Sequence, residues 1–127
     1  EADVLAMMSE RRALGFEMFV ADLDGVVGYA SYAQFRAGVG YAHSMEHSLA
    51  LAVEGQGRGA GRALMQAIED HARTVSARIM VGCVTGDNAR SIRFHKALGY
   101  DQVGHLPDAG YKFGKYYDLL LMQKILS

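Results

Sequence analysis

The sequence predicts an α+β domain, a sheet with helices packed on its faces, and three observations lead to this fold class. Segments with the pattern of strands come first, and helical and strand-like segments then alternate. The 127 residues suffice for one domain with a core of ordinary size, which needs no disulfide or metal to fold. Half of the residues are hydrophobic and 21% are charged, which excludes a disordered chain and a fibrous repeat. We therefore expect residues 1–127 to form a single domain.

The first part of the chain predicts one helix and three strands. Helix-forming residues fill Glu1–Leu14, and the glycine that follows is a suitable helix end. Phe16–Leu23 and Val26–Phe35 have the composition of strands, with a tight hairpin turn at Asp24-Gly25 between them. Ser44–Val53 is the third predicted strand.

The second part predicts two helices and three strands in alternation. From Ala60 to Val75 the apolar residues recur with the period of a helix. Arg78–Val84 is a short apolar run typical of a buried strand, and Asn88 is a suitable N-cap for a second helix through Leu98. Tyr100–Leu106 and Tyr116–Ile125 are the last two predicted strands.

Charge and cysteine content narrow the classes of function and location. A net charge of −1 offers no basic surplus for nucleic acid or an anionic membrane, so we expect neither partner. No stretch approaches the roughly 20 apolar residues of a membrane span, and we expect no signal peptide. Cys83 is the single cysteine, which we expect in the core, and this usage fits a reducing, cytoplasmic compartment.

The strongest local signal is a glycine-rich turn between a strand and a helix. Glycines alternate with other residues in Gly55-Gln56-Gly57-Arg58-Gly59-Ala60-Gly61-Arg62. Glycine lets the backbone approach a ligand closely, and the first turn of the following helix leaves N–H groups without partners. The helix dipole and two arginines add positive charge, so the turn predicts a site for phosphate or pyrophosphate. The alternative is a flexible turn in which glycines ease the start of the helix.

Two other phosphate motifs fit this turn less well. A Walker loop requires lysine and a hydroxyl residue after its last glycine, and neither follows here. Gly55-x-Gly57-x-x-Ala60 loosely matches the dinucleotide fingerprint, which also requires an acidic residue about 20 residues further on. The nearest acid, Asp87, lies about 30 residues past Gly57, so dinucleotide binding is the weaker alternative.

Two motifs together resemble the GNAT superfamily of N-acetyltransferases. Gln56-x-x-Gly59-x-Gly61 has the form of that superfamily's acetyl-coenzyme A pyrophosphate motif, and Asn88–Tyr100 is similar to its second signature. Val27–Tyr32, Met45–Ser48 and Gly110–Lys115 resemble the phosphinothricin N-acetyltransferase-like branch. The resemblance implies a mixed, mostly antiparallel central sheet flanked by helices. It also implies that a strand and a helix which usually precede Glu1 are missing from this sequence.

The resemblance implies a binding site for acetyl-CoA as co-substrate. Backbone N–H groups of the glycine turn would hold the pyrophosphate, and the strand edge before it would offer groups to the pantetheine arm and the acetyl carbonyl. Asn88 would bind the pantetheine arm from the other side, in addition to or in place of its role as a helix N-cap. The expected coenzyme-binding residues are Leu49, Ala50, Leu51, Gly57, Arg58, Gly59, Ala60, Gly61, Arg62, Asn88 and Ala97.

Two residues are candidates for proton transfer. Glu46 is our candidate general base, acting through water, because a carboxylate on a sheet face costs energy unless it is paired or lies in a solvated cleft. A structural salt bridge is the alternative for it. His95 lies seven residues after Asn88, where many superfamily members place the tyrosine that protonates the departing thiolate. A partly buried helix histidine is the alternative for His95.

A metal site is not expected. His43 and His47 flank Glu46 on a strand, but four strand residues span about 13 Å, so the two histidines cannot share an ion.

The acceptor side of the site is less marked in the sequence. Arg36 and Tyr41 could meet an acceptor carboxylate, and the resemblance makes the loop with Lys112 and Phe113 a wall of the substrate pocket. We expect direct attack of a small amine in a ternary complex, the acceptor being an amino acid or analogue of the phosphinothricin, methionine sulfone or methionine sulfoximine type. Acetylation of a protein N-terminus or a polyamine, and a non-catalytic coenzyme A sensor, are the alternatives. A homodimer is implied by the resemblance.

Overall fold

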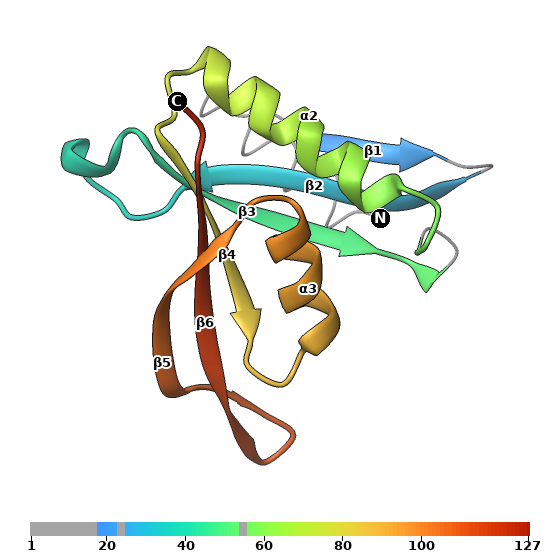
Figure 1. Ribbon diagram of the computed structural model, residues 1–127, viewed down its shortest axis with the longest axis vertical. Coiled ribbons are helices and arrows are strands. Elements are labelled where there is room, and N and C mark those ends of the chain that lie inside the picture. Colours follow the sequence, from blue (N-terminus) through green and yellow to red (C-terminus); the bar gives the residue numbers. More distant parts are fainter. Residues whose placement is uncertain (1–17, 23–24, 54–55) are drawn as a thin grey trace.

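Six strands form one mixed sheet in the computed structural model, which describes residues 18–22, 25–53 and 56–127 (Figure 1). The sheet order is β1-β2-β3-β4-β6-β5. The helix expected over Glu1–Leu14, and the ends of the expected strand and turn at residues 16–17 and 23–24, lie outside the described residues. The elements are β1 (Met18–Asp22), β2 (Val26–Gln34), the 3₁₀ turn η1 (Val39–Tyr41), β3 (Ser44–Leu51), α2 (Ala60–Thr74), β4 (Ile79–Thr85), α3 (Ala89–Ala97), β5 (Asp101–Lys112) and β6 (Lys115–Ile125).

The predicted α+β fold is confirmed, and the sheet is mostly antiparallel. Four of the neighbouring strand pairs are antiparallel, and β3 and β4 form the one parallel pair of the described sheet. At the first hairpin the N–H of Gly25 donates to Asp22 Oδ1 over 2.8 Å, and Gly25 has a positive φ of 124°. The glycine predicted for this turn is therefore needed for its backbone conformation.

The parallel ladder between β3 and β4 is short. It comprises three register pairs, Ser44 with Ile79, Met45 with Met80 and Glu46 with Val81. Beyond them β3 continues to Leu51 along β2, and β4 continues to Thr85 along β6. The two strands therefore separate after Glu46, and the sheet opens between them.

Both helices pack on the same face of the sheet. The apolar side of α2 lies over β1, β2 and β3, and it contributes Leu64, Met65 and Ile68 to a buried cluster that includes Met45. The α3 helix lies beside β4, and its His95 contacts His47 of β3. The face of β3 with Met45 and His47 is thus the core face, as the alternation of strand side chains predicts.

The β5–β6 hairpin extends further than the sequence predicts (Figure 1). The sequence predicts strands over Tyr100–Leu106 and Tyr116–Ile125, with residues 107–115 between them, a stretch that includes Pro107 and Gly110. Instead β5 pairs with β6 up to Lys112. The register is irregular between Gln102 and Gly104 and between Leu106 and Gly110, and the second irregularity contains Pro107. A proline is tolerated here because β5 is the edge strand of the sheet.

The prediction that Cys83 lies in the core is wrong. Its side chain is exposed, whereas Gly82 and Val84 on either side of it are buried. Cys83 lies on the sheet face opposite the two helices, so an apolar strand sequence did not distinguish the two faces.

A buried carboxylate connects α2 to the C-terminal strands. Glu69 of α2 is 2% exposed and accepts hydrogen bonds from the Tyr100 hydroxyl over 2.8 Å and from Lys124 Nζ over 2.7 Å. Burial, followed by the negative charge of Glu69 and the hydrogen bond to it, raises the pKa of Tyr100. The phenol therefore remains protonated and continues to donate.

We expect Tyr100→Phe to lower the free energy of unfolding by roughly 1–3 kcal/mol, because it leaves a buried carboxylate short of one donor. Urea unfolding followed by circular dichroism measures the change, with Tyr111→Phe, whose ring is 65% exposed, as the control. A Tyr100→Phe variant as stable as wild type would mean that Lys124 alone satisfies Glu69.

Candidate functional site

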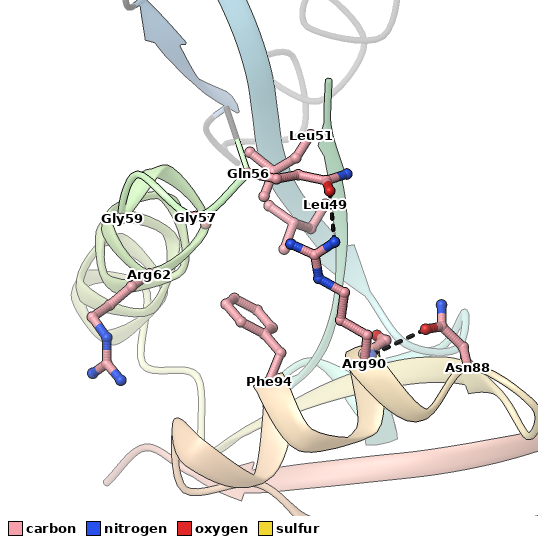
Figure 2. A pocket seen from close by; sticks show the side chains of 11 residues that line it. Leu49, Leu51, Gln56, Gly57, Gly59, Arg62, Asn88, Arg90 and Phe94 are labelled. Atoms are coloured by element: carbon pink, nitrogen blue, oxygen red, sulfur yellow. Dashed lines mark hydrogen bonds between the residues drawn. The ribbon is translucent and has the colours of Figure 1, made fainter. Parts of the chain in front are cut away.

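A pocket of about 410 Å³ lies where β3 has separated from β4, between the β3 edge, the glycine turn and α3 (Figure 2). Its walls combine apolar side chains from the strand and α3 with backbone from the turn. The lining residues are Leu49, Leu51, Gln56, Gly57, Gly59, Gly61, Arg62, Asn88, Arg90, Ser91 and Phe94. Segments predicted separately from the sequence, the turn, the strand edge and the Asn88 helix, thus meet at one place.

The glycine turn has the backbone geometry of an anion cradle. Gly57 and Gly59 have positive φ angles of 74° and 80°, which residues other than glycine rarely adopt. A Cβ on Gly61 would lie 3.0 Å from Leu51 Cδ1 and 3.2 Å from the Phe94 ring, so a side chain there would crowd the pocket wall. Since the first N–H groups of α2 directly follow this turn and have no partners within the helix, the residues present fit a phosphate group.

The charge around the pocket is positive. Its described lining contains Arg62 and Arg90 but no acidic side chain, and the first turn of α2 has no acid either. Arg62 extends from α2 away from Phe94, whereas Arg90 extends from α3 across the pocket (Figure 2). Arg58, which the sequence analysis places in the site, does not line this pocket.

The coenzyme-binding residues expected from the sequence did not include Gln56, Arg90, Ser91 and Phe94, which also line the pocket. The last three belong to the first turns of α3, directly after the capping residue Asn88. The signal was present, because a helix whose N-cap borders a ligand also presents its next residues to that ligand.

Asn88 caps α3, as predicted. Its Oδ1 accepts from the N–H of Ser91 over 3.0 Å, and Asn88 also lines the pocket. Ala97, at the other end of α3, lies instead in an adjacent cavity that shares Gly59 and Arg62 with the first. Two neighbouring cavities therefore meet at the start of α2, and Ala97 lines only the second of them.

The β3 edge faces the pocket with Leu49 and Leu51. On its other side β3 pairs with β2 through Leu51, which faces Gly28 in the register. Successive residues of a strand direct their backbone groups to alternate sides, so some N–H and C=O groups of this segment point toward the pocket. Ala50 is exposed and does not line the pocket with its side chain.

Glu46 lies at the last pair of the β3–β4 ladder, where the two strands separate. Its side chain is half-buried, on the face opposite Met45 and His47. Partial burial, then the negative charge of Glu46 and a hydrogen bond to it, raises the pKa of Cys83 to about 11. Cys83 is therefore a protonated thiol beside Glu46 and is not a thiolate nucleophile at neutral pH.

His47 and His95 form a buried pair where the two strands separate. Their Nε2 atoms are 2.9 Å apart, and the rings are stacked with centroids 5.0 Å apart. His95 Nδ1 lies 2.8 Å from the carbonyl of Ser91, which can only accept, so this nitrogen carries the proton of the neutral ring. His95 Nε2 then accepts from His47 Nε2–H, and His47 Nδ1 is a buried acceptor without a partner among the described residues.

This pair does not favour the predicted role of His95 as the proton donor to a thiolate. His95 is 3% exposed, does not line the pocket, and has both ring nitrogens in hydrogen bonds. Burial lowers the pKa of His95 against the opposing effect of the Ser91 carbonyl, and burial followed by the proximity of His95 lowers the pKa of His47 to about 3. Both imidazoles are therefore neutral near pH 7.

Gly82 makes room for the two imidazoles. A Cβ at this position would lie 2.5 Å from His47 Nε2 and 2.8 Å from His95 Nε2. The histidine pair therefore depends on a glycine in β4 that no motif marked in the sequence.

The predicted acceptor residues lie elsewhere on the molecule. Arg36 stacks over Tyr41 at 5.2 Å, in the β2–β3 connection at the end of β3 remote from the glycine turn (Figure 1). Lys112 and Phe113 lie at the tip of the β5–β6 hairpin and line a separate cavity with Asp87 of the β4–α3 connection. The structure thus brings neither pair into the pocket beside β3.

Several large apolar side chains of the β5–β6 hairpin are exposed. They are Val103, Leu106, Tyr111, Phe113, Tyr116 and Ile125. The expected homodimer stays a prediction.

Within residues 18–22, 25–53 and 56–127, no three His, Cys, Asp or Glu side chains lie close enough to hold a metal ion. No helix in this part of the chain is long and apolar enough to cross a membrane.

Comparison with known families matches residues 9–121 to the acetyltransferase (GNAT) domain. Over 120 residues the chain is 38% identical to the L-methionine sulfoximine/L-methionine sulfone acetyltransferase of Salmonella typhimurium, covering 94% of this chain and 70% of the relative. It is 34% identical over 116 residues to the phosphinothricin N-acetyltransferase of Alcaligenes faecalis, covering 89% of this chain and 58% of the relative.

Two solved structures have nearly the same fold. An acetyltransferase from Salmonella typhimurium, determined with its cofactor acetyl-CoA, superposes with a TM-score of 0.91 at 35% identity, covering 99% of this chain and 73% of that one. The ribosomal-protein-alanine N-acetyltransferase of Brucella melitensis superposes with the same TM-score at 37% identity, covering 98% of this chain and 77% of that one.

We expect the free energy of unfolding to decrease as the pH is lowered below about 6.5, the ordinary histidine pKa. Below this pH the unfolded chain takes up a proton at His47, whereas the folded protein does not. The sign follows from linkage: a histidine whose folded pKa is lowered makes the free energy of unfolding rise with pH up to its unfolded pKa. Between pH 7.5 and pH 5 this amounts to about 2 kcal/mol for one such histidine.

Urea unfolding of wild type and His47→Gln across pH 4.5–7.5 measures this dependence. The variant is less stable at neutral pH but loses stability less steeply on acidification. His43→Gln removes an exposed imidazole from the turn just before the same strand and serves as the control. Parallel pH profiles for wild type and His47→Gln would show that His47 is not held neutral in the fold.

Proposed function

The chain belongs to the acetyltransferase (GNAT) family, and from this premise we propose that it acetylates the α-amine of a small amino acid or amino-acid analogue of the methionine sulfone, methionine sulfoximine or phosphinothricin type. The observation that carries the proposal is a single pocket in which a glycine cradle at a helix N-terminus continues into an open strand edge. This combination suits a ligand with a pyrophosphate at one end and a thioester at the other. The names of the two curated relatives support the acceptor class.

The donor side of the proposed site uses backbone more than side chains. N–H groups of Gly57–Arg62 bind the pyrophosphate of acetyl-CoA, with the positive end of the α2 dipole behind them. The β3 edge at Leu49–Leu51 holds the pantetheine arm, and Asn88 approaches it from α3. A strand N–H directed into the opening is placed to stabilise the oxyanion of the tetrahedral intermediate.

Glu46 is the proposed general base, acting through a water molecule. It lies where β3 and β4 separate, so an acceptor reaching the opening from this face would meet it. An α-amine with a pKa of about 8 is roughly one-tenth neutral at pH 7, so a modest base suffices. The amine nitrogen bonds to the carbonyl carbon, its proton passes to Glu46, the C–S bond breaks, and the sulfur leaves as a thiolate that takes a proton from solvent.

His95 is proposed as a positioning residue instead of a proton donor. Its Nδ1–H bond to the Ser91 carbonyl lies in the first turns of α3, which border the pocket. Its Nε2 bond to His47 connects α3 to β3. The pair therefore fixes the distance between two walls of the coenzyme pocket.

A panel of acceptors tests the proposed function by release of the coenzyme A thiol. We expect rapid turnover with methionine sulfone, methionine sulfoximine or phosphinothricin and slow turnover with polyamines. A peptide beginning with alanine tests the protein N-terminus alternative, which the likeness to the Brucella enzyme makes relevant. Turnover with the peptide alone would overturn the small-acceptor proposal, and coenzyme binding without turnover of any acceptor would favour a sensor.

We expect Glu46→Gln to lower kcat by roughly 100-fold with the best acceptor, since general bases typically contribute 10²–10⁴-fold. KM for acetyl-CoA should change little, because Glu46 does not line the coenzyme pocket. Steady-state kinetics measure both parameters, and Asp101→Asn, at an exposed carboxylate of β5, is the charge-matched control. Unchanged kcat in Glu46→Gln would assign proton removal to another group.

A further inference from the structure

One side-chain hydrogen bond crosses the mouth of the coenzyme pocket. Arg90 Nη1, from the first turn of α3, donates to Gln56 Oε1 over 2.6 Å, and both residues line the pocket. Figure 2 shows the Arg90 side chain extending over the pocket to reach Gln56 beside the end of β3. We refer to this contact between Arg90 and Gln56 as the clasp.

The clasp leaves a positive charge without a negative partner in this contact. The Arg90 guanidinium donates to a neutral amide, whereas the comparable exposed Arg73 pairs with the carboxylate of Asp70. Hydrogen bonds from a guanidinium to an anion are roughly twice as strong as those between neutral groups. An anion that reached the pocket would therefore be a better acceptor for Arg90 than Gln56 is.

The position of Gln56 determines which anion that would be. Gln56 directly precedes Gly57, a glycine of the cradle with a positive φ. The end of the Arg90 side chain is thus held next to the backbone groups that fit a phosphate. The other lining arginine, Arg62, extends away from the pocket in Figure 2, so Arg90 is the better placed of the two to close over a bound phosphate.

We propose that Arg90 is a phosphate-binding residue for the coenzyme and that Gln56 holds it across the pocket until the coenzyme displaces the amide. The inference rests on the proposed acetyl-CoA site. On binding, Arg90 exchanges the Gln56 carbonyl oxygen for a phosphate oxygen. Gln56 therefore competes with the coenzyme for Arg90 in place of assisting it, and the two partners of one hydrogen bond have opposite effects on affinity.

Calorimetric titration of acetyl-CoA into purified full-chain variants tests this assignment. We expect Arg90→Gln to raise Kd about tenfold, the usual effect of losing a hydrogen bond to a charged group. Gln56→Met removes the competing acceptor at similar length, so its Kd should equal or fall below that of wild type. Arg93→Gln removes an exposed arginine of the same helix that does not line the pocket, and it is the charge-matched control.

S-acetylpantetheine, which has the thioester but no pyrophosphate, separates phosphate binding from a structural role. The proposal predicts that Arg90→Gln and wild type bind it equally. Equal weakening of acetyl-CoA binding by Arg90→Gln and Gln56→Met would identify a structural bridge and overturn the proposal. So would an Arg90→Gln variant with wild-type affinity for acetyl-CoA, or one that loses S-acetylpantetheine to the same extent.

The same titrations separate this inference from the function on which it rests. If wild type did not bind acetyl-CoA, the proposed function itself would fail. If wild type binds and turns over acetyl-CoA while Arg90→Gln binds it equally well, the function stands and the clasp has no role in it. Arg90 and Gln56 are both exposed, so circular dichroism should show unchanged folding in both variants.

Discussion

The early separation of β3 from β4 is the constraint on which the site depends. Three parallel pairs hold the strands together, and the ladder ends at Glu46 and Val81. Two imidazoles, from β3 and α3, occupy the helix side of this point because Gly82 has no side chain there. Had the ladder continued, the β3 edge would be paired with β4, and no backbone group of it could face a ligand.

The open sheet separates the positive charge of the proposed coenzyme pocket from the carboxylate of the proposed base. The donor pocket lies on the helix side, with arginines and the α2 N-terminus but no acid in its described lining. Glu46 lies on the opposite face, beside the protonated thiol of Cys83. A carboxylate within the phosphate cradle would repel the phosphates of the coenzyme. The position of Glu46 on the opposite face of the sheet avoids this repulsion and still leaves the carboxylate next to the opening between β3 and β4.

Local sequence patterns predicted the structural features that are formed by residues close together in the chain. They did not predict the contacts between residues far apart in the chain. The glycine turn, the α2 stripe and the Asn88 cap each involve residues a few positions apart, and their structures follow the prediction. His47 and His95 are 48 residues apart, and their contact depends on a bare glycine in a third element. Cys83 and the length of β5 were mispredicted for a similar reason, since face exposure and pairing with β6 are properties of the assembled sheet.

Neutrality of the histidine pair matters for Glu46, the residue that directly precedes His47 in the chain. An imidazolium at His47 would place a positive charge next in the chain to the proposed base. Burial keeps His47 neutral by lowering its pKa to about 3. Because His95 Nδ1–H donates to the Ser91 carbonyl, His95 Nε2 must accept the hydrogen bond from His47 Nε2–H. The pair can therefore join β3 to α3 without altering the charge next to Glu46, which a salt bridge in the same position could not do.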